Sequence, residues 1–572
     1  MADPEDLVII IIVGGGQIAL STAQEICGLP GHHVVVLWRR DPDLARAVEG
    51  AGAVFVAAAR PDSSEGLERA GVRRAITILA LSPDDQLNLH AALLARDANP
   101  RIRIVLRQFN RTLAQKLEQN LANCSVLSLA WHSAATYAAA AIDPACFRGL
   151  QFPQPEGPLT GFATRIAEDC GVGECTVAQA ERVLATRIVA VDDVIDPARD
   201  AVLRDGAELI IYGEIARLEG SAPRRPMPRR RAAFATRLRL QGRRSRRLTR
   251  LNPILARLAA ATLAFLLVGA AYFHSVFGGS WLDAVYFVVT TMTTTGYGDL
   301  TPDRGDPVEI VGAMVLMLAG ITLTGLFIAF GASLLTRVHW VKLQGLRPVY
   351  HRGHIVVCGG GSIGTSVIDL LFGLGKRLVV IEQDPDTSLV ERAREQRFDL
   401  LTGDASRDST LDLCHLDAAH SLIALTNVDT LNLEIALGAR NPTMPIVLRI
   451  AEASFAQSIA RHFEFDTTYS AAALAAPALV GLSQFSGSRG RVGFGGREFA
   501  IAEFGIEDRA QSPPLGAIPI ATSRGSDFEV AHDVDYRTLG AGDRALVLIP
   551  LAPVKEEETG FAAEKQPAAD LR

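Results

Sequence analysis

The chain has 572 residues, enough for roughly four structural units of ordinary size. Its 57 Lys and Arg against 63 Asp and Glu give a net charge of −6, which excludes a globally basic nucleic-acid binder. Mean hydropathy is +0.20 and only 21% of residues are charged, against about 25% in ordinary soluble domains, so the composition favours a membrane-embedded segment.

An apolar run over residues 7–13 opens the chain and could be mistaken for the core of a signal peptide. Asp3, Glu5 and Asp6 precede it where a signal peptide carries positive charge, and three glycines follow at once. The pattern therefore predicts a buried strand that enters a tight turn.

Two parts of the chain repeat one pattern. The first copy reads VIIIIVGGGQIA from Val8, VVVLWRRDPD over 34–43 and ITILALSPDD…IRIVLR over 76–107. The second reads HIVVCGGGSIG from His354, followed by LVVIEQDPD and SLIALTNVDT…IVLRI. Strand, Gly-rich turn, helix and strand alternate, which predicts a parallel doubly wound sheet in each copy. A strand-rich tail follows each copy.

Between the copies lie a basic segment and two uncharged stretches. Residues 221–250 contain twelve arginines and no acid, and the stretches 258–282 and 310–336 contain no charged residue. A helix of about 20 apolar residues spans a bilayer core, so membrane helices are predicted over 253–275 and 308–336. Basic residues beyond both outer ends predict both termini, and all seven cysteines, in the cytoplasm. For the Arg-rich segment, binding to membrane lipids is favoured over binding to nucleic acid.

These patterns divide the chain into eight segments. They are an α/β domain over 1–150, its lobe over 151–220, the Arg-rich linker over 221–250, a membrane domain over 251–340 (with a re-entrant helix and turn over 281–300), a linker over 341–352, a second α/β domain over 353–485, its lobe over 486–553, and a disordered tail over 554–572.

The loop between the predicted membrane helices carries the sequence Thr294-Thr295-Gly296-Tyr297-Gly298-Asp299. It resembles the selectivity filter of potassium channels, with Thr295 where that family most often has Val. The resemblance covers 253–336 and implies an outer helix, a pore helix, a filter and an inner helix in a homotetramer. It implies K⁺ bound at Thr294, Thr295, Gly296 and Tyr297, and a gating hinge at Gly320, for which close packing of helices by small residues is the alternative.

Elementary chemistry supports these residue types. Rings of backbone carbonyls from four loops can replace the water shell of K⁺, and glycine permits the backbone angles that this requires. Acids at the outer mouth, Asp299, Asp303, Asp306 and Glu309, would concentrate cations. Tyr286 on the pore helix is placed where it can hydrogen-bond Asp299; packing alone is the alternative explanation for a Tyr there.

Both α/β copies resemble RCK domains, the Rossmann-like regulators of potassium conductance, over about 7–140 and 353–480. Glu382 lies 21 residues beyond Gly361, where a carboxylate binds ribose hydroxyls. The resemblance implies that the second copy binds an adenine nucleotide, NAD(H) or ADP/ATP. The alternative is that this domain binds no ligand and serves only in assembly. The residues expected to hold it are Gly359, Gly360, Gly361, Ser362, Ile363, Gly364, Glu382, Gln383, Asp404, Ala405, Thr426 and Asn427.

The first copy predicts a weaker site. Aligning Asp41-Pro42-Asp43 with the D-P-D triplet over 384–386 puts Arg39 opposite Glu382, and Ala58-Ala59-Arg60 opposite Gly403-Asp404-Ala405. Arg39 and Arg60 would either hold a phosphate-rich ligand or form surface ion pairs. The residues of this weaker site are Gly14, Gly16, Gln17, Ile18 and Arg39.

The sequence therefore predicts a mixed fold: an all-α, two-helix pore domain in the cell (inner) membrane, flanked by two Rossmann-like domains with small lobes. The predicted function is a potassium channel gated by a ring of eight RCK domains. Gating by Ca²⁺ stays an alternative, weakened because Asp404 and Asp429 are the only obvious local acids. A regulator of a cation transporter and a membrane-anchored dehydrogenase are the other classes, and no catalytic set beside either Gly-rich turn indicates an enzyme.

Overall fold

The computed structural model divides the chain into two compact units: residues 1–223 with 348–572, and residues 224–347. The residues that it describes are 8–108, 111–153, 157–221, 253–302, 306–343, 349–439, 444–463, 465, 467–485, 487–505, 514, 516–524, 527–530 and 542–551. The predicted tail, and all but the first residue of the predicted Arg-rich linker, lie outside these residues.

The first copy folds as the predicted doubly wound sheet, with six parallel strands in the order β3-β2-β1-β4-β5-β6. The Val- and Ile-rich β1 and β2 are buried along most of their length, as parallel strands covered by helices require. The elements are β1 Val8–Val13, α1 Gly16–Cys27, β2 His32–Trp38, α2 Pro42–Gly50, β3 Val54–Ala57, α3 Ser64–Arg69, β4 Thr77–Ala80, α4 Asp85–Ala98, β5 Arg103–Arg107, α5 Arg111–Asn120, β6 Cys124–Leu127 and α6 Leu129–Ile142.

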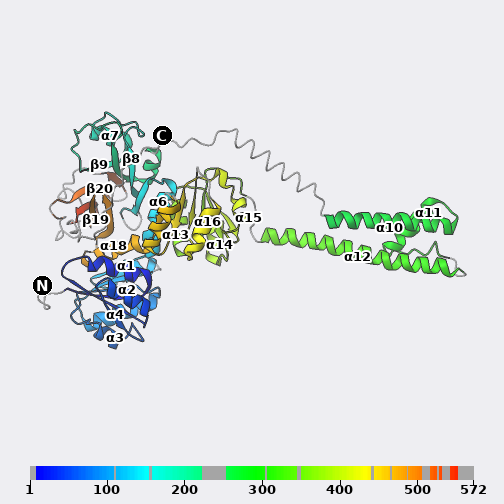
Figure 1. Cartoon of the computed structure of the whole chain (residues 1–572), viewed down its shortest axis with the longest axis horizontal. Coiled ribbons are helices and arrows are strands. Elements are labelled where there is room, and N and C mark those ends of the chain that lie inside the picture. Colours follow the sequence, from blue (N-terminus) through cyan, green and yellow to red (C-terminus); the bar gives the residue numbers. More distant parts are fainter. Residues whose placement is uncertain are drawn as a thin grey trace, which may run out of the picture. The chain divides into compact units, whose positions relative to one another are not determined.

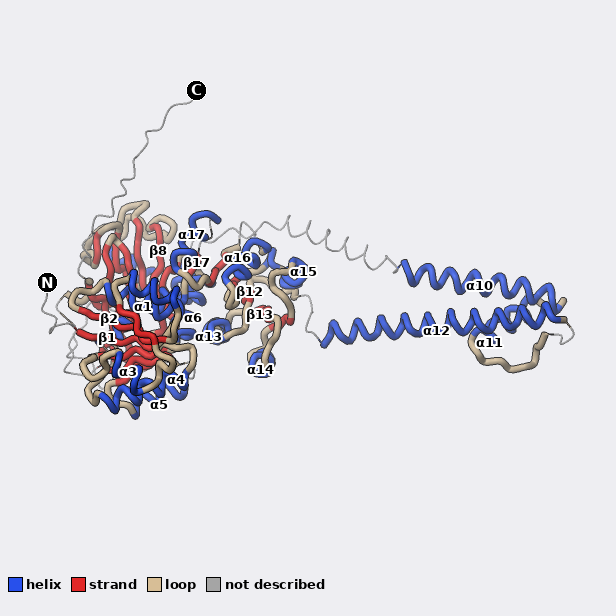
Figure 2. Tube along the Cα trace, turned by 60° about the horizontal axis from the view of Figure 1, so that its bottom comes forward, coloured by secondary structure: helices blue, strands red, loops and turns tan. Residues whose placement is uncertain are grey.

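The second copy repeats this arrangement with the strand order β14-β13-β12-β15-β16-β17, again all parallel. Figure 2 shows the strands in red. The elements are β12 Ile355–Cys358, α13 Ser362–Gly373, β13 Leu378–Glu382, α14 Thr387–Glu395, β14 Asp399–Thr402, α15 Asp408–Leu411, two single-turn 3₁₀ helices (Asp412–Cys414 and Leu416–Ala418), β15 Ser421–Ala424, α16 Asp429–Gly438, β16 Ile446–Arg449, α17 Ala453–Phe463, β17 Thr467–Tyr469 and α18 Ala471–Gln484.

Each copy continues into a lobe with an antiparallel sheet, and the two lobes share one apolar core that includes Phe162, Tyr212 and Phe499. The first lobe contains β7 Cys146–Gln151, β8 Leu159–Ile166, α7 Val177–Leu184, β9 Arg187–Val191, β10 Val194–Ile195, β11 Glu208–Glu214 and α8 Ile215–Ser221. The second contains β18 Ser488–Phe494, β19 Arg497–Gly505, β20 Ile518–Arg524, β21 Asp527–Val530 and β22 Arg544–Pro550.

The two copies exchange the helix that follows the last strand of each parallel sheet. Helix α6 of the first copy packs against α13 of the second, beside which it lies in Figure 1, and α18 of the second packs against α1 of the first. The Ala-rich faces of α6 join the apolar core beneath β12 and α13, while Ala475 and Leu479 of α18 join the core beneath β1 and β2. Each copy therefore completes its apolar core with a helix of the other.

Equivalent hydrogen bonds secure both exchanged helices at their carboxyl ends. Ser421, at the start of β15, donates to the carbonyl of Ala141 at 2.6 Å. Thr77, at the start of the matching strand β4, donates to the carbonyl of Ser483 at 3.1 Å. These bonds supply partners for helix-end carbonyls that have none within the helix.

A buried Arg–His contact lies where α6 meets α18. The Nη2 of Arg148 lies 3.1 Å from Nε2 of His132, and its Nη1 donates to the carbonyl of Leu474 at 3.1 Å. Burial, followed by the charge of Arg148, lowers the pKa of His132 to about 3, so its imidazole is neutral at pH 7 and can accept the hydrogen bond.

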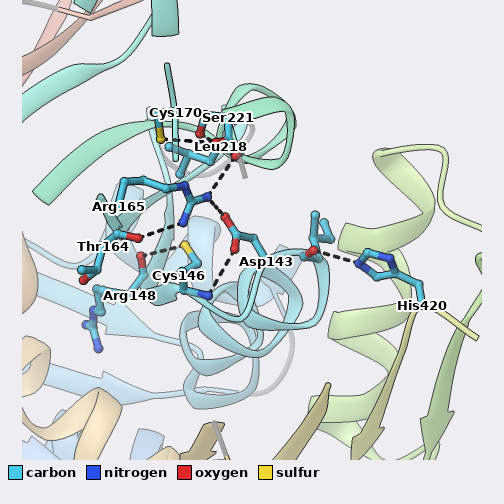
Figure 3. A network of polar contacts seen from close by, with 11 residues as sticks. Asp143, Cys146, Arg148, Thr164, Arg165, Cys170, Leu218, Ser221 and His420 are labelled. Atoms are coloured by element: carbon cyan, nitrogen blue, oxygen red, sulfur yellow. Dashed lines mark hydrogen bonds and ion pairs between the residues drawn. The ribbon is translucent and has the colours of Figure 1, made fainter. Parts of the chain in front are cut away.

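A polar network closes the end of α6, as Figure 3 shows. The guanidinium of Arg165 forms an ion pair with Asp143, and both side chains are about 97% buried. The same guanidinium donates to the carbonyl of Leu218 on α8 at 3.0 Å. From the second copy, a ring nitrogen of His420 lies 2.8 Å from the carbonyl of Ile142. The network thus joins α6, β8, α8 and the second copy.

Within residues 253–302 and 306–343, the described part of the second unit, three helices are present: α10 Pro253–Phe277, α11 Trp281–Met292 and α12 Pro307–Leu343. By length and apolar composition, one helical stretch among the described residues, Pro307–Leu326, is long enough to cross a membrane. The described part of α10 contributes a shorter apolar stretch, Ala260–Val276. The helix predicted over 308–336 continues to residue 343, and the crossing of the membrane by both helices stays a prediction.

We expect Asp143→Ala to lower the free energy of unfolding by about 3–5 kcal/mol, because it leaves the Arg165 guanidinium buried without its counter-charge. Urea unfolding of the detergent-purified chain, followed by circular dichroism, measures the change. The matched control is Glu68→Ala, which breaks the exposed Glu68–Arg73 pair and is expected to leave unfolding unaltered. Equal effects of the two variants would contradict a structural role for the buried pair.

Candidate functional site

The loop from 293 to 302 is positioned by the short helix α11. Ser280 caps this helix by accepting a hydrogen bond from the Asp283 N–H at 3.2 Å. The helix then packs through Phe287, Val288 and Met292 into an apolar core with the helices on either side of it. The loop thus starts from a fixed point in the second unit.

Within this loop the backbone changes hand at alternate residues. The φ angles of Thr294, Gly296 and Gly298 are +59°, +51° and +75°. This left-handed region suits glycine and is uncommon for Thr, so the backbone carries local strain at Thr294. Backbone N–H groups of Thr295 and Gly296 both donate to the carbonyl of Thr290, at 2.9 and 3.2 Å, which ties the turn to the end of α11.

Tyr286 supports the outer part of the turn. Its hydroxyl donates to Oδ2 of Asp299 at 3.0 Å, as expected from the sequence. Its ring stacks on that of Tyr297, with centroids 6.4 Å apart and planes 6° from parallel. The side chain of Tyr297 therefore points toward the supporting helix, which leaves the turn's other edge to its backbone.

Gly320 lies where α12 crosses the end of α11. A Cβ at this position would be 2.8 Å from the Cα of Met292 and 3.1 Å from its Cγ, so only glycine permits the approach. Gly325, one turn further along, would have open space around a Cβ. The structure gives Gly320 a packing role, which was the alternative to the predicted hinge; the hinge itself stays a prediction.

The Gly-rich turn of the second copy brings backbone atoms into close approach. Gly359 has a φ of +107°, and a Cβ there would lie 3.0 Å from the backbone of both Leu425 and Thr426. A Cβ on Gly364 would lie 2.0 Å from the carbonyl oxygen of Gly359. The turn leads directly into α13, whose first residues, Ser362 and Ile363, follow the N-terminal position Gly361. This is the arrangement of backbone N–H groups that suits a phosphate.

Glu382, at the end of β13, turns its carboxylate toward this turn. Its Oε2 accepts the N–H of Gly360 at 2.5 Å, and its Oε1 accepts the N–H of Gln383 at 2.8 Å. Oε1 also accepts the N–H of Asp384 at 3.3 Å. A carboxylate has about four lone-pair positions, so Oε2 can still accept a hydroxyl group. The structure thus brings Glu382 and the glycines together.

The other predicted residues line the neighbouring strand ends. Asp404 accepts hydrogen bonds from the N–H and hydroxyl of Ser406, at 3.0 and 2.8 Å, and forms an ion pair with Arg407. The Ser406 hydroxyl, ahead of Arg407, holds the pKa of Asp404 below its usual range, so the group is ionised at pH 7. Ala405 is buried beside it.

The loop containing Thr426 and Asn427 is fixed by two residues that the sequence interpretation missed. The Asn432 amide accepts from Thr426 N–H and hydroxyl at 2.8 and 2.7 Å, and donates to the carbonyl of Arg449. Nη1 of Arg449 donates to Oδ1 of Asn427 at 3.1 Å.

The first copy has the same supporting pair. Asn88 accepts from Ser82 N–H at 2.8 Å and donates to the Arg107 carbonyl at 2.9 Å. The repeated letters LNL and IVLR, present in both copies, were the signal that could have identified the four residues.

In the first copy Gly14, Gly16, Gln17 and Ile18 form the matching turn, and Gly16 has a φ of +75°. The predicted alignment of Arg39 with Glu382 is wrong, because the pairing of the strands places Arg39 one residue beyond the position of Glu382. Val13 pairs with Leu37 as Cys358 pairs with Ile381, so Trp38 takes the position of Glu382.

The physical reason for the misalignment lies in the two D-P-D triplets. Asp41, the first Asp of its triplet, caps α2 by accepting from Leu44 N–H at 3.0 Å. Asp386, the last of its triplet, caps α14 by accepting from Leu389 N–H at 2.8 Å. The helix therefore starts after the first Asp of the triplet in one copy and after the last Asp in the other. Aligning the two triplets by sequence misaligns the strands that precede them.

The acids considered for Ca²⁺ are engaged elsewhere. Asp404 is bound as described above, and both oxygens of Asp429 accept the N–H of Ala451. Within the parts of the chain that the structure describes, no group of three or more His, Cys, Asp and Glu side chains is placed to hold a metal ion.

Comparison with known proteins identifies the same three parts of the chain, the two α/β copies and the helical segment between them. The TrkA-N domain model matches residues 10–128 and 355–470, and the ion channel model matches 260–337. Potassium channel protein 1 of Methanocaldococcus jannaschii is 27% identical over 201 residues, 34% of this chain and 59% of that protein. The voltage-gated potassium channel Kch of Escherichia coli is 28% identical over 202 residues, 32% of this chain and 48% of that protein. In both, the match covers less than two thirds of the relative.

Among solved structures, that of the GsuK channel bound to NAD covers 96% of this chain and 77% of its own, at 14% identity and a TM-score of 0.48. The two family models give the chain one TrkA-N (RCK) domain on each side of an ion channel domain.

Proposed function

We propose that this protein is a potassium-selective channel, assembled as a homotetramer in the cell membrane and regulated by an adenine nucleotide in the second copy. The observation that carries the proposal is the turn from Thr294 to Gly298. Its backbone alternates in hand, it follows a short pore-type helix, and Tyr286 braces it through Asp299. Four such turns around one axis would present the carbonyls of Thr294 through Tyr297 to K⁺.

Acidic residues support cation entry. Asp299 and Asp306 lie in the described part of the loop around the turn, and Glu309 lies in the first turn of α12. Carboxylates at a channel mouth raise the local concentration of cations.

Matched exposed apolar positions support the assembly of both copies into one ring. Leu93 on α4 and its equivalent Leu437 on α16 are 42% and 41% exposed. Leu113 on α5 and its equivalent Phe455 on α17 are 37% and 38% exposed. The pseudo-symmetric copies thus expose the same two positions, as expected if both copies use the same helices to contact neighbouring chains.

The nucleotide is assigned to the second copy on the geometry of its turn. Backbone N–H groups at the start of α13 suit a phosphate, and Glu382 lies where a carboxylate can accept ribose hydroxyls.

Contacts within the first unit connect this turn with the elements next to both linkers. Helix α13 begins at the turn, and Lys376, just beyond its end, forms an ion pair with Glu219 on α8 at 2.6 Å. Helix α8 is the last described element before the sequence that enters α10. At the other linker, the N–H of Val349 donates to the carbonyl of Leu413 at 2.8 Å. A nucleotide can shift the gate only by its difference in affinity between open and closed states.

For the filter, we expect currents from reconstituted protein to reverse near the K⁺ equilibrium potential. Gly296→Ala should abolish conduction and leave tetramers intact, because a Cβ at a φ of +51° disfavours the required backbone conformation. Gly278→Ala is the matched control: it has a similar φ, +57°, but lies outside the turn, so conduction should persist. A reversal potential that ignores the K⁺ gradient would contradict the proposal.

For the nucleotide site, Glu382→Ala should weaken ADP or NADH binding about 10- to 100-fold, because a charge-assisted hydrogen bond contributes roughly 1.5–3 kcal/mol. Isothermal titration calorimetry of the full-length protein measures it. Asp384→Ala, which removes an exposed carboxylate two residues further on, and Arg39→Ala should change binding far less. Tight binding that survives Glu382→Ala would refute the assigned site.

For the topology, all seven cysteines lie in the unit formed by 1–223 and 348–572, and all are free thiols. An impermeant thiol reagent added to intact cells should therefore label none of them. The positive control is Gly279→Cys in the loop between α10 and α11, which should be labelled from outside. Labelling of the unmodified chain from outside would overturn the cytoplasmic placement of both termini.

A further inference from the structure

The indole of Trp38 lies directly against the first Gly-rich turn. A Cβ built on Gly15 would be 2.2 Å from Nε1 of Trp38 and 2.6 Å from its Cε2, so the contact exists only because residue 15 has no side chain. In the second copy a Cβ built on the equivalent Gly360 would be 2.4 Å from Cδ2 of Leu389 and 3.3 Å from Oε2 of Glu382. An aromatic ring in the first copy thus takes the position of the carboxylate in the second.

Two matched pairs of hydrogen bonds show that the two positions are equivalent. Gly14 N–H donates to the Leu37 carbonyl as Gly359 N–H donates to Ile381. The carbonyl of Trp38 then accepts the N–H of Ala58 at 2.8 Å. In the second copy the carbonyl of Glu382 likewise accepts the N–H of Gly403 at 2.9 Å.

The ring is held in place by packing. Trp38 is partly buried and contacts both apolar cores of the first copy, including the core that contains α18 of the second. The guanidinium carbon of Arg39 lies 5.9 Å from the ring centroid, a cation–π distance. Trp38 is therefore a packed part of this domain rather than a free surface side chain.

The chemistry of the replacement opposes a nucleotide. An indole offers one N–H donor and no acceptor, so it cannot accept the ribose hydroxyls that a carboxylate accepts. By register Ala59 stands in place of Asp404, which removes the second acidic acceptor. The ring packs against the middle glycine of the turn, the position that Leu389 and Glu382 share in the second copy.

We propose that Trp38 closes the first Gly-rich turn to adenine nucleotides, so that each chain binds one nucleotide, in the second copy. This inference rests on the proposed function, because it assumes that the second copy binds a nucleotide. It makes residue 38 the determinant of which copy responds to the ligand and gives a tetramer four regulatory sites instead of eight.

Equilibrium dialysis of the purified full-length channel with ADP, and separately with NADH, tests it by the number of molecules bound per chain. The wild-type chain should bind one. Trp38→Glu combined with Ala59→Asp should bind two, measured at concentrations about a hundredfold above the wild-type Kd so that a weaker site is also filled. The reciprocal variant Glu382→Trp should bind none. Tetramer size and thermal unfolding verify that each variant is folded, and Trp38→Ala serves if the double variant is not.

The outcomes separate the two claims. A folded double variant that still binds one nucleotide, or a wild-type chain that binds two, overturns the role of Trp38. If the wild type binds none and the double variant binds one, the nucleotide site of the second copy fails while the closure by Trp38 stands. If neither binds, both claims fail.

Discussion

The exchange of α6 and α18 between the two copies is the interaction on which the rest of the unit formed by residues 1–223 and 348–572 depends. Each helix buries an Ala-rich surface in the core of the other copy, and Ser421 and Thr77 bind the helix-end carbonyls in equivalent ways. Because burial of apolar surface is the main source of stability, neither sheet has a complete core without the other copy. The Gly-rich turn of the second copy therefore opens onto a helix, α13, that is packed against the first.

The two copies share one scaffold but differ in the side chains beside their Gly-rich turns. The amides Asn88 and Asn432 hold equivalent loops through equivalent hydrogen bonds, so this part serves the fold in both copies. The residues at the end of the second strand differ: Trp38 in one copy and Glu382 in the other. Hydrogen bonds to backbone atoms maintain the shape of both domains, and the side chains at these strand ends are where the two turns differ.

The sequence predicted what depends on local patterns. The Val- and Ile-rich runs before the glycines became buried parallel strands, and the Tyr286–Asp299 hydrogen bond was expected from the position of Tyr286 on its helix. The exchanged helices were not predicted, because the Ala-rich pattern of residues 129–142 shows that a helix is buried without showing which core receives it.

The position of Trp38 was missed for a different reason. Helix capping, at Asp41 in one copy and at Asp386 in the other, shifts two identical triplets relative to the strands before them. Strand register depends on backbone pairing over the whole sheet, so it cannot be read from the match of a three-residue motif. The packing of Gly320 against Met292 likewise joins residues 28 positions apart and leaves no local mark in the sequence.

The proposed pore and the proposed regulatory site are separate parts of one chain, and single-channel recording in planar bilayers tests this separation most directly. With ADP or NADH applied to the cytosolic side, wild-type channels should change their open probability at constant unitary K⁺ conductance. Glu382→Ala should remove that response and leave the unitary conductance unchanged. A response that persists in Glu382→Ala, or a nucleotide effect on the unitary conductance itself, would contradict a regulatory site at Glu382 that is separate from the pore.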